Sequence, residues 1–395
     1  MTGALARLRV LDLSRMVSGP YAGRLLAGFG ADVIKVEPPA GDPSRRAGPF
    51  PGDIPDPEAS ALFLHLNTGK RGVTLDLTTA QGRALLLDLV AGADVLLENF
   101  APGELERLGM DDGALPRANP DLIHLSITPF GASGPYRDYV AGDLVLQAMS
   151  TMMSHTGEPG RPPLKLFGYQ AYYVAGAHAA VAALAALRGR DATGGPRRID
   201  LSVLECAANI IAATLTSWSY NRVVTGRRGH GRGAWGVYPC DDGFISISVY
   251  HHGREWHDFV EMLGYDALRD PKFGTSSGRF DNIEELETYI LGWVMGRGKK
   301  ELAEIGRRHR IAIGYDASMA DLFDSPQLRA RGFFAPIDHP VAGRQTYTGA
   351  PMKLSATPWA MDRPAPLLGQ HNAEVYGALG RTPAHLAALR GMGAI

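Results

Sequence analysis

The stretch LRVLDLSRMVSGPYAGRLLAGFGADVIKVE, residues 8–37, decides the fold of this chain. Its two ends, 8–13 and 31–37, are short apolar runs of the kind that forms buried strands. Between them, residues 19–30 carry apolar side chains at helical spacing and close on a glycine. A strand, a helix and a second strand in this order predict a crossover unit of a parallel sheet.

The same alternation of strand and helix patterns continues to residue 128. The further expected elements are strands at 71–77, 93–100 and 121–128 and a helix at 78–93 capped by Thr78 or Thr79. Such alternation predicts an α/β fold with a Rossmann-like, doubly wound parallel sheet. Ligands of these sheets bind beyond the carboxyl ends of the strands. The loops expected to form the site are therefore those after Leu13, Glu37, Asn99 and Thr128.

The rest of the chain predicts a second, smaller domain. Residues 171–188 form an expected alanine-rich helix. This run just reaches the length of a membrane span, but its alanines, Gln170 and His178 favour a core helix of a soluble protein. The glycine- and arginine-rich stretch 225–236 breaks the pattern. The expected organisation is a large domain at 1–224, a smaller α+β domain at 225–320, and a C-terminal segment at 321–395 that returns to the large domain.

Composition limits the classes of function. Forty Lys and Arg residues against 41 Asp and Glu residues give a net charge of −1, so no nucleic-acid or membrane partner is expected. The N-terminal residues lack the apolar core of a signal peptide, and a cytoplasmic location is expected. No metal site is expected, because the cluster of His251, His252 and His257 has no acidic or cysteine partner at metal spacing.

Two loops place amide and cationic side chains beside predicted strands. They are Asn67, Lys70 and Arg71 before the strand at 71–77, and Asn99, Phe100 and Arg107 at and after the end of the strand at 93–100. Cations and amides beside an aromatic ring suit an anionic, partly flat ligand such as a nucleotide. The alternative interpretation is that these residues only cap helices or carry solvent-exposed charges, and bind no ligand.

Six segments carry a resemblance to a known family. In chain order they are LRVLDLSRMVSGPYAGRLLAGFGADVIKVEPPAGD, NTGKRGVTLDL, ADVLLENFAPGELERLGM, NPDLIHLSITPFGASGPYRD, DLVLQAMSTMMSHTGEPGRPPLK and PLLGQHNAEV. They resemble the family III CoA-transferases of the CaiB/BaiF type, which include formyl-CoA transferase, carnitine CoA-transferase and α-methylacyl-CoA racemase. The resemblance implies two domains, an interlocked dimer of ring-like chains, and acyl-CoA and a carboxylic acid as substrates with no tightly bound cofactor. It also implies CoA contacts from Asn67, Lys70, Asn99, Phe100 and Arg107, with Arg71 beside them.

The chain departs from this family where the nucleophile is expected. Family transferases carry an aspartate at the start of the alanine-rich helix, and its carboxylate attacks the acyl-CoA and then carries CoA as a thioester. Alignment on Ala175 and Gly176 places Tyr172 at that position. A phenol with a pKa near ~10 is protonated at neutral pH and cannot form the mixed anhydride.

Two other positions differ from the family patterns. Racemases pair the aspartate with a histidine in a G-H-D pattern, whereas A-G-D in this chain puts Gly142 at the histidine and leaves Asp143. Both members of the racemase acid/base pair are therefore absent. Val17 stands where some transferases carry a catalytic glutamine, so side-chain support for an oxyanion is not expected there.

Three hypotheses remain open. The favoured one is a subunit of a heteromeric CoA-transferase that moves CoA between carboxylic acids, with a homologous sister subunit supplying the aspartate, as in the benzylsuccinate CoA-transferase type. The second is a self-sufficient acyl-CoA transferase, isomerase or lyase, as a homodimer, using Glu158 or Asp143. The alternative interpretation of Glu158 is a residue of a turn, and that of Asp143 is a helix-capping residue. The third is a non-catalytic protein that binds CoA thioesters.

Aromatic residues bear on the size of the acyl group. Those near the expected site are Tyr169, Tyr172, Tyr173, Trp235 and Tyr238. If they line the pocket, they favour a bulky acyl group over formate, and a packed core is the alternative.

Overall fold

The computed structural model describes residues 3–110, 113–193, 197–227, 234–249, 254–361 and 363–395. The chain divides into two compact units. The large unit comprises Met1–Thr156, Pro163–Thr225 and Ala330–Ile395, and the small unit comprises Gly157–Pro162 and Gly226–Arg329. The small unit extends further along the chain than the expected domain at 225–320, and it also takes in Gly157–Pro162.

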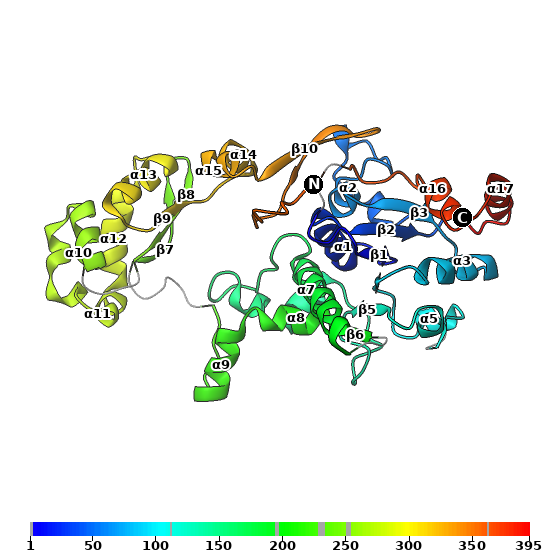
Figure 1. The fold of residues 1–395 in the computed structure, drawn as a ribbon. Coiled ribbons are helices and arrows are strands. Elements are labelled where there is room, and N and C mark those ends of the chain that lie inside the picture. Colours follow the sequence, from blue (N-terminus) through cyan, green and yellow to red (C-terminus); the bar gives the residue numbers. More distant parts are fainter. Residues whose placement is uncertain (1–2, 111–112, 194–196, 228–233, 250–253, 362) are drawn as a thin grey trace. The chain divides into compact units, whose positions relative to one another are not determined.

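The large unit is built on a parallel sheet (Figure 1). Its strands are β1 (Arg9–Asp12), β2 (Asp32–Glu37), β3 (Arg71–Thr74), β4 (Val95–Glu98), β5 (Ile123–Thr128) and β6 (Arg197–Ser202). Within the described residues they pair in parallel in the order β3-β2-β1-β4-β5-β6. The expected strands and their parallel arrangement are confirmed. The chain reverses direction across the sheet between β1 and β4, which creates a topological switch point.

Helices cover both faces of this sheet. The helices of the large unit are α1 (Ser18–Gly28), α2 (Ala61–Asn67), α3 (Ala80–Val90), α4 (Glu104–Arg107), α5 (Ala114–Ala118), α6 (Asp143–Met149), α7 (Gln170–Thr193), α8 (Val203–Asn209), α9 (Ala212–Asn221), α16 (Asn372–Gly377) and α17 (Pro383–Gly391). Successive strand residues alternate between two cores: Val10 packs with α1, α7 and α8, and Leu11 packs with α3, α16 and α17. Thr79 caps α3 by accepting a hydrogen bond from the Gly82 amide. The doubly wound arrangement is thus confirmed.

Helix α7 is the expected alanine-rich helix, and only one of its faces is buried. Ala171, Ala175, Ala179 and Ala183 are buried in the core. On the opposite face Val181 and Leu184 are exposed. By length and composition alone α7 would be able to cross a membrane, but its alanine stripe packs against α1, α8 and the sheet. The prediction of a core helix therefore holds for one face.

Gly176 lets α7 approach α1 closely. A Cβ atom added there would lie 2.5 Å from the Ser18 carbonyl oxygen and 3.1 Å from Cδ1 of Tyr21. Since the backbone carbonyl cannot move away cheaply, we expect Gly176→Ala to lower the free energy of unfolding by about 1–3 kcal/mol in urea titrations. Gly189 of the same helix is the matched control, because its added Cβ would meet only Arg197 Cζ, at 4.0 Å. Gly189→Ala is expected to be neutral or to stabilise by up to about 1 kcal/mol, and equal losses in both variants would contradict this packing.

The small unit has its own sheet and core. In chain order its elements are β7 (Trp235–Cys240), β8 (Gly243–Ser248), α10 (Arg254–Leu263), α11 (Ser276–Asp281), α12 (Ile283–Val294), α13 (Lys299–His309), β9 (Ile313–Tyr315) and α14 (Met319–Asp324), after which α15 (Pro326–Ala330) leads back to the large unit. Strands β7, β8 and β9 pair antiparallel, and the expected hairpin is β7–β8. In the large unit, β10 (Phe334–His339) and β11 (Gly343–Thr348) form a separate hairpin.

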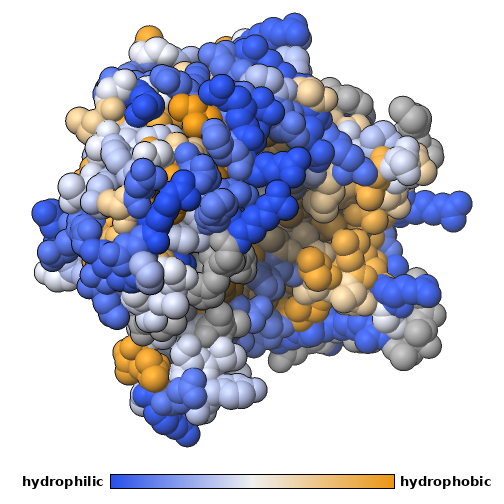
Figure 2. All heavy atoms as spheres, turned by 90° about the vertical axis from the view of Figure 1, so that its left-hand side faces the viewer, coloured by the Kyte–Doolittle hydropathy of each residue, from blue (hydrophilic) through white to orange (hydrophobic). Residues whose placement is uncertain are grey.

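Large apolar side chains stay exposed on both units. They include Val181, Leu184, Leu215, Trp218 and Tyr220 in the large unit, and Trp235, Val237 and Phe244 in the small unit. Figure 2 shows one face of the molecule, on which hydrophobic side chains are visible among mostly hydrophilic ones.

Candidate active site

A cavity of about 830 Å³ opens at the carboxyl edge of the parallel sheet. The loops after β1, β4 and β5 line it, so it lies at the switch point between β1 and β4. Its lining includes Arg15, Met16, Val17, Ser18, Asn99, Phe100, Arg107, Ile127, Arg137, Asp138, Tyr139, Val140, Gly142, Asp143, Tyr169, Tyr172 and Val203. This is the edge at which a doubly wound sheet binds its ligand.

Cationic and apolar side chains share the wall of this cavity. The guanidinium groups belong to Arg15, Arg107 and Arg137. The guanidinium of Arg15 lies 4.6 Å from the centre of the Phe100 ring and 3.6 Å from the Glu104 carboxylate. The volume and the mixed lining suit a large ligand with anionic groups and an apolar part.

The loop between β1 and α1 forms part of the wall and is held by side chains. The Asn99 Oδ1 accepts from the Arg15 amide at 2.7 Å, and the Asn99 Nδ2 donates to the Arg15 carbonyl at 2.8 Å. Met16 has a left-handed backbone, with φ of 62°. Its amide donates to Asp42 Oδ1 at 3.1 Å, and the Lys35 ammonium donates to the Ser14 carbonyl.

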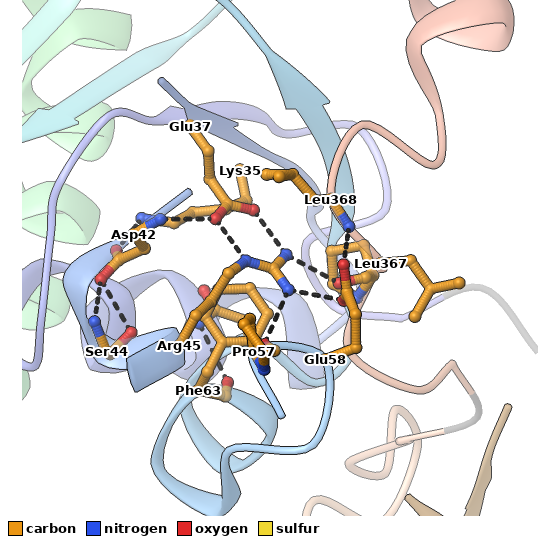
Figure 3. Close-up of polar contacts among 12 residues, drawn as sticks. Lys35, Glu37, Asp42, Ser44, Arg45, Pro57, Glu58, Phe63, Leu367 and Leu368 are labelled. Atoms are coloured by element: carbon orange, nitrogen blue, oxygen red, sulfur yellow. Dashed lines mark hydrogen bonds and ion pairs between the residues drawn. The ribbon is translucent and has the colours of Figure 1, made fainter. Parts of the chain in front are cut away.

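This loop contacts a set of ion pairs, which we call the buried network; Figure 3 draws the part of it around Asp42 and Arg45. Its pairs, all at 2.7 or 2.8 Å, are Lys35–Asp42, Lys70–Asp12, Arg45–Glu37 and Arg45–Glu58. Arg45 engages both Glu37 oxygens through Nε and Nη2, and its guanidinium stacks on the Phe63 ring at 3.7 Å. Asp42 links the network to the loop, because its carboxylate binds Lys35, the Ser44 amide and the Met16 amide.

The charge on Asp42 makes part of the stability depend on pH. Burial would raise the pKa of Asp42, but attraction to Lys35 and hydrogen bonds from Lys35 and Ser44 outweigh it and hold the pKa below its usual value. The stabilisation is therefore complete above about pH 4 and is lost as the pH falls through the lowered pKa. We expect the difference in unfolding free energy between the wild-type chain and Asp42→Asn to be largest at pH 7 and to narrow below pH ~4.

Urea titrations from pH 7 to pH 3 measure that difference. The matched control is Asp338→Asn, because Asp338 is exposed and lies 3.7 Å from Arg344. The control variant is expected to track the wild-type chain across the range. A constant difference for Asp42→Asn from pH 7 to pH 3 would contradict the role given to its charge.

Asn67, Lys70 and Arg71 lie outside the cavity lining. The fully buried Lys70 ammonium donates to Asp12 Oδ2 at 2.7 Å and to Asn67 Oδ1 at 2.9 Å. Burial lowers the pKa of Lys70 to about 8, against the opposing attraction of Asp12. Arg71 binds Asp32 and Glu374. Direct contact of these three side chains with CoA stays a prediction, and their positions give it no support.

Asn99, Phe100 and Arg107 do line the cavity and lie together at its β4 side. Arg15 and Arg137 were not singled out from the sequence. Arg15 follows Leu13, in one of the loops marked as the expected site, so its position was the available signal. Arg137 lies in the loop after β5, which was also marked as part of the expected site, so the same signal was available for it.

Tyr172 lies in the cavity at the start of α7. Its phenol donates to the Ala141 carbonyl at 3.2 Å. Burial raises the pKa of Tyr172, and the neighbouring Asp143 and Tyr169 raise it further. The phenol is therefore neutral at physiological pH and unsuited to attack a thioester.

Asp143 reaches the same cavity but is already engaged as the cap of α7. Its Oδ1 accepts from the Ala171 amide at 2.9 Å, and its Oδ2 accepts from Gln147 Nε2 at 2.6 Å. The Lys165 ammonium lies 3.0 Å from the same Oδ2. These donors stabilise a fixed carboxylate, which makes it a poor nucleophile.

The family pattern of CoA-transferase family III matches residues 5–372. The chain belongs to CoA-transferase family III.

Curated relatives of this family III chain are similar over nearly their whole length. The subunit BbsE of succinyl-CoA:(R)-benzylsuccinate CoA-transferase from Thauera aromatica is 33% identical, over 99% of this chain and 98% of that protein. The succinate–glutarate CoA-transferase of Agrobacterium fabrum is 34% identical over 95% of each chain. The formyl-CoA:oxalate CoA-transferase of Streptomyces avermitilis is 33% identical over 100% of each.

A solved structure supports the same assignment. A CAIB/BAIF family protein from Brucella suis has a TM-score of 0.87 and 32% identity, covering 96% of this chain and 100% of that one. The chain is thus a CoA-transferase by family. The enzymes of this family act on acyl-CoA thioesters. The resemblance seen in the sequence is confirmed.

The remaining expected site residues of this family III chain are divided between the cavity lining and other parts of the structure. Gly142 and Val17 line it, whereas Glu158 is in the small unit and lies 2.8 Å from Arg161. Tyr169 and Tyr172 line the cavity, Tyr173 packs edge-on against Tyr21, and Trp235 and Tyr238 belong to a separate cavity of about 890 Å³ in the small unit. His251 and His252 lie outside the described residues, and among the described ones no three metal-ligating side chains cluster.

Proposed function

We propose that this chain is the nucleophile-lacking subunit of a heteromeric family III CoA-transferase. It binds an acyl-CoA thioester in the cavity of the large unit, and a homologous sister subunit supplies the catalytic aspartate. The observation that carries the proposal is the neutral Tyr172 phenol in the cavity, where the family resemblance places that aspartate.

The chemistry of transfer explains why this substitution matters. A carboxylate attacks the thioester carbonyl, and the C–S bond breaks with CoA leaving as the thiolate. The CoA thiolate attacks the enzyme carbonyl of this mixed anhydride, which forms an enzyme–CoA thioester and releases the first acid. The second acid attacks that thioester and expels the thiolate, and the thiolate then attacks the carbonyl of the second acid, which forms the new acyl-CoA and frees the enzyme carboxylate. Each step needs an acyl-accepting carboxylate, which Tyr172 does not provide.

Two observations support a sister subunit. The relative from Thauera aromatica, 33% identical, is itself named as a subunit. Exposed apolar side chains on α7 and α9, including Val181, Leu215 and Trp218, offer a surface for another chain. We propose an interlocked assembly of ring-like subunits, in which the partner is a homologue and not a second copy of this chain.

A self-sufficient enzyme is the second candidate, because Asp143 does reach the cavity. Such an enzyme would use Asp143 as the nucleophile or as the base of an isomerase or lyase. The three donors around its carboxylate weigh against this role. Glu158, in the small unit and paired with Arg161, has less support.

Calorimetric titration with CoA and with succinyl-CoA tests the binding half of the proposal. We expect both to bind, and Arg107→Ala to weaken binding by about tenfold through loss of one charge-assisted contact. Arg390→Ala is the matched control, since Arg390 is exposed in the last turn of α17 and far in the sequence from the cavity lining. Absence of binding to the wild-type chain would overturn the proposed function.

A further inference from the structure

Both polar atoms of the Asn99 side-chain amide hydrogen-bond to the backbone of Arg15. The amide oxygen accepts from the Arg15 N–H at 2.7 Å and the amide nitrogen donates to the Arg15 carbonyl at 2.8 Å. Asn99 follows β4 and Arg15 follows β1, so this pair of bonds joins the two loops at the switch point. A side-chain amide that makes both bonds to one residue fixes that peptide segment in position and orientation.

The residue after Arg15 needs this support. Met16 has φ of 62°, a left-handed conformation that is uncommon for a residue with a side chain. Such a backbone persists only where surrounding contacts over-determine it. The Asn99 amide holds the preceding residue, and Asp42 Oδ1 holds the Met16 N–H at 3.1 Å.

The segment that these hydrogen bonds fix includes Arg15, which lines the cavity. The side chain of Arg15 is 41% exposed, and its guanidinium lies over the Phe100 ring at 4.6 Å. A shift of this loop would displace the cation that faces the ligand. We infer that Asn99 is a positioning residue, which acts on the bound anionic ligand through the loop and Arg15 and not by touching that ligand.

The first test needs no ligand. Amide hydrogen exchange is followed by mass spectrometry in the ligand-free chain, on peptides that contain Arg15 and Met16. Asn99→Ala is expected to speed exchange there by about tenfold or more, because both bonds to Arg15 are lost. Asn99→Asp keeps an acceptor for the Arg15 amide and should restore most of the protection.

Asn119 offers a matched control. Its amide also clamps a backbone turn, by donating to the Val90 carbonyl at 3.0 Å and to the Ala93 carbonyl at 2.6 Å, but it does not line the cavity. Asn119→Ala should leave exchange at Arg15 and Met16 unchanged. Unchanged exchange at these two residues in Asn99→Ala would overturn the inference.

The second test rests on the proposed function and uses CoA as the probe. Asn99→Ala and Arg15→Ala should each weaken CoA binding, and the double variant should bind no more weakly than the weaker single variant. Additive losses would overturn the inference, because they would indicate an independent contact of Asn99 with CoA. If the wild-type chain does not bind CoA, the proposed function fails, while the exchange experiment still decides the role of Asn99.

Discussion

Alone, this chain is expected to move CoA between succinyl-CoA and a second carboxylic acid at least about 10³-fold more slowly than it does together with its sister subunit. The reason is chemical: Tyr172 is a neutral phenol, and the Asp143 carboxylate is held by Ala171, Gln147 and Lys165. The rate is measured by chromatographic separation of the two CoA thioesters over time.

The control for this experiment is a sister subunit whose catalytic aspartate is replaced by alanine. It should assemble with this chain and restore no transfer. Rapid transfer by the isolated chain would contradict the account, and so would full activity with the aspartate-free sister.

Replacing Arg45 by methionine is expected to lower the free energy of unfolding by about 3–5 kcal/mol. The Arg45 side chain is 3% exposed, and its guanidinium binds both oxygens of Glu37, whose side chain is fully buried. Methionine matches the volume of the arginine stem but leaves the Glu37 charge buried without its partner. Urea titration at pH 7 measures the loss.

Arg307→Met is the matched control, since Arg307 binds Glu304 in a similar two-pronged manner on the surface of α13. An exposed pair of this kind contributes little to stability, because both charges remain solvated. A loss of similar size in both variants would contradict the importance given to burial in the network. Should Arg45→Met fail to fold, Arg45→Lys keeps the charge and is expected to lose less.

The sequence was sufficient for the framework of the fold and for the place of the cavity. Apolar runs such as 8–13 and 31–37 indicate which segments form buried strands. Because these strands alternate with helices, the sequence predicts a parallel sheet. The loops at the carboxyl ends of β1 and β4 then follow from topology, and the structure places the cavity there.

The neighbours of individual polar groups could not be predicted in the same way. Lys70 is a cation in a polar loop by sequence, but the fold brings it to Asp12, 58 residues away, and buries both. Asp143 likewise meets Lys165 and Ala171 only because α6 and the start of α7 pack together. Periodicity reports which face of an element is apolar, but the partner of a charge depends on contacts between distant segments.

The most direct test of the central claim is a search for a covalent intermediate on the isolated chain. The chain is incubated with succinyl-CoA, treated with hydroxylamine, and analysed by intact-mass and peptide mass spectrometry. The account predicts an unmodified chain, with neither an acyl nor a CoA adduct. A hydroxamate at Asp143, at Glu158 or at any other carboxyl group of this chain would contradict it.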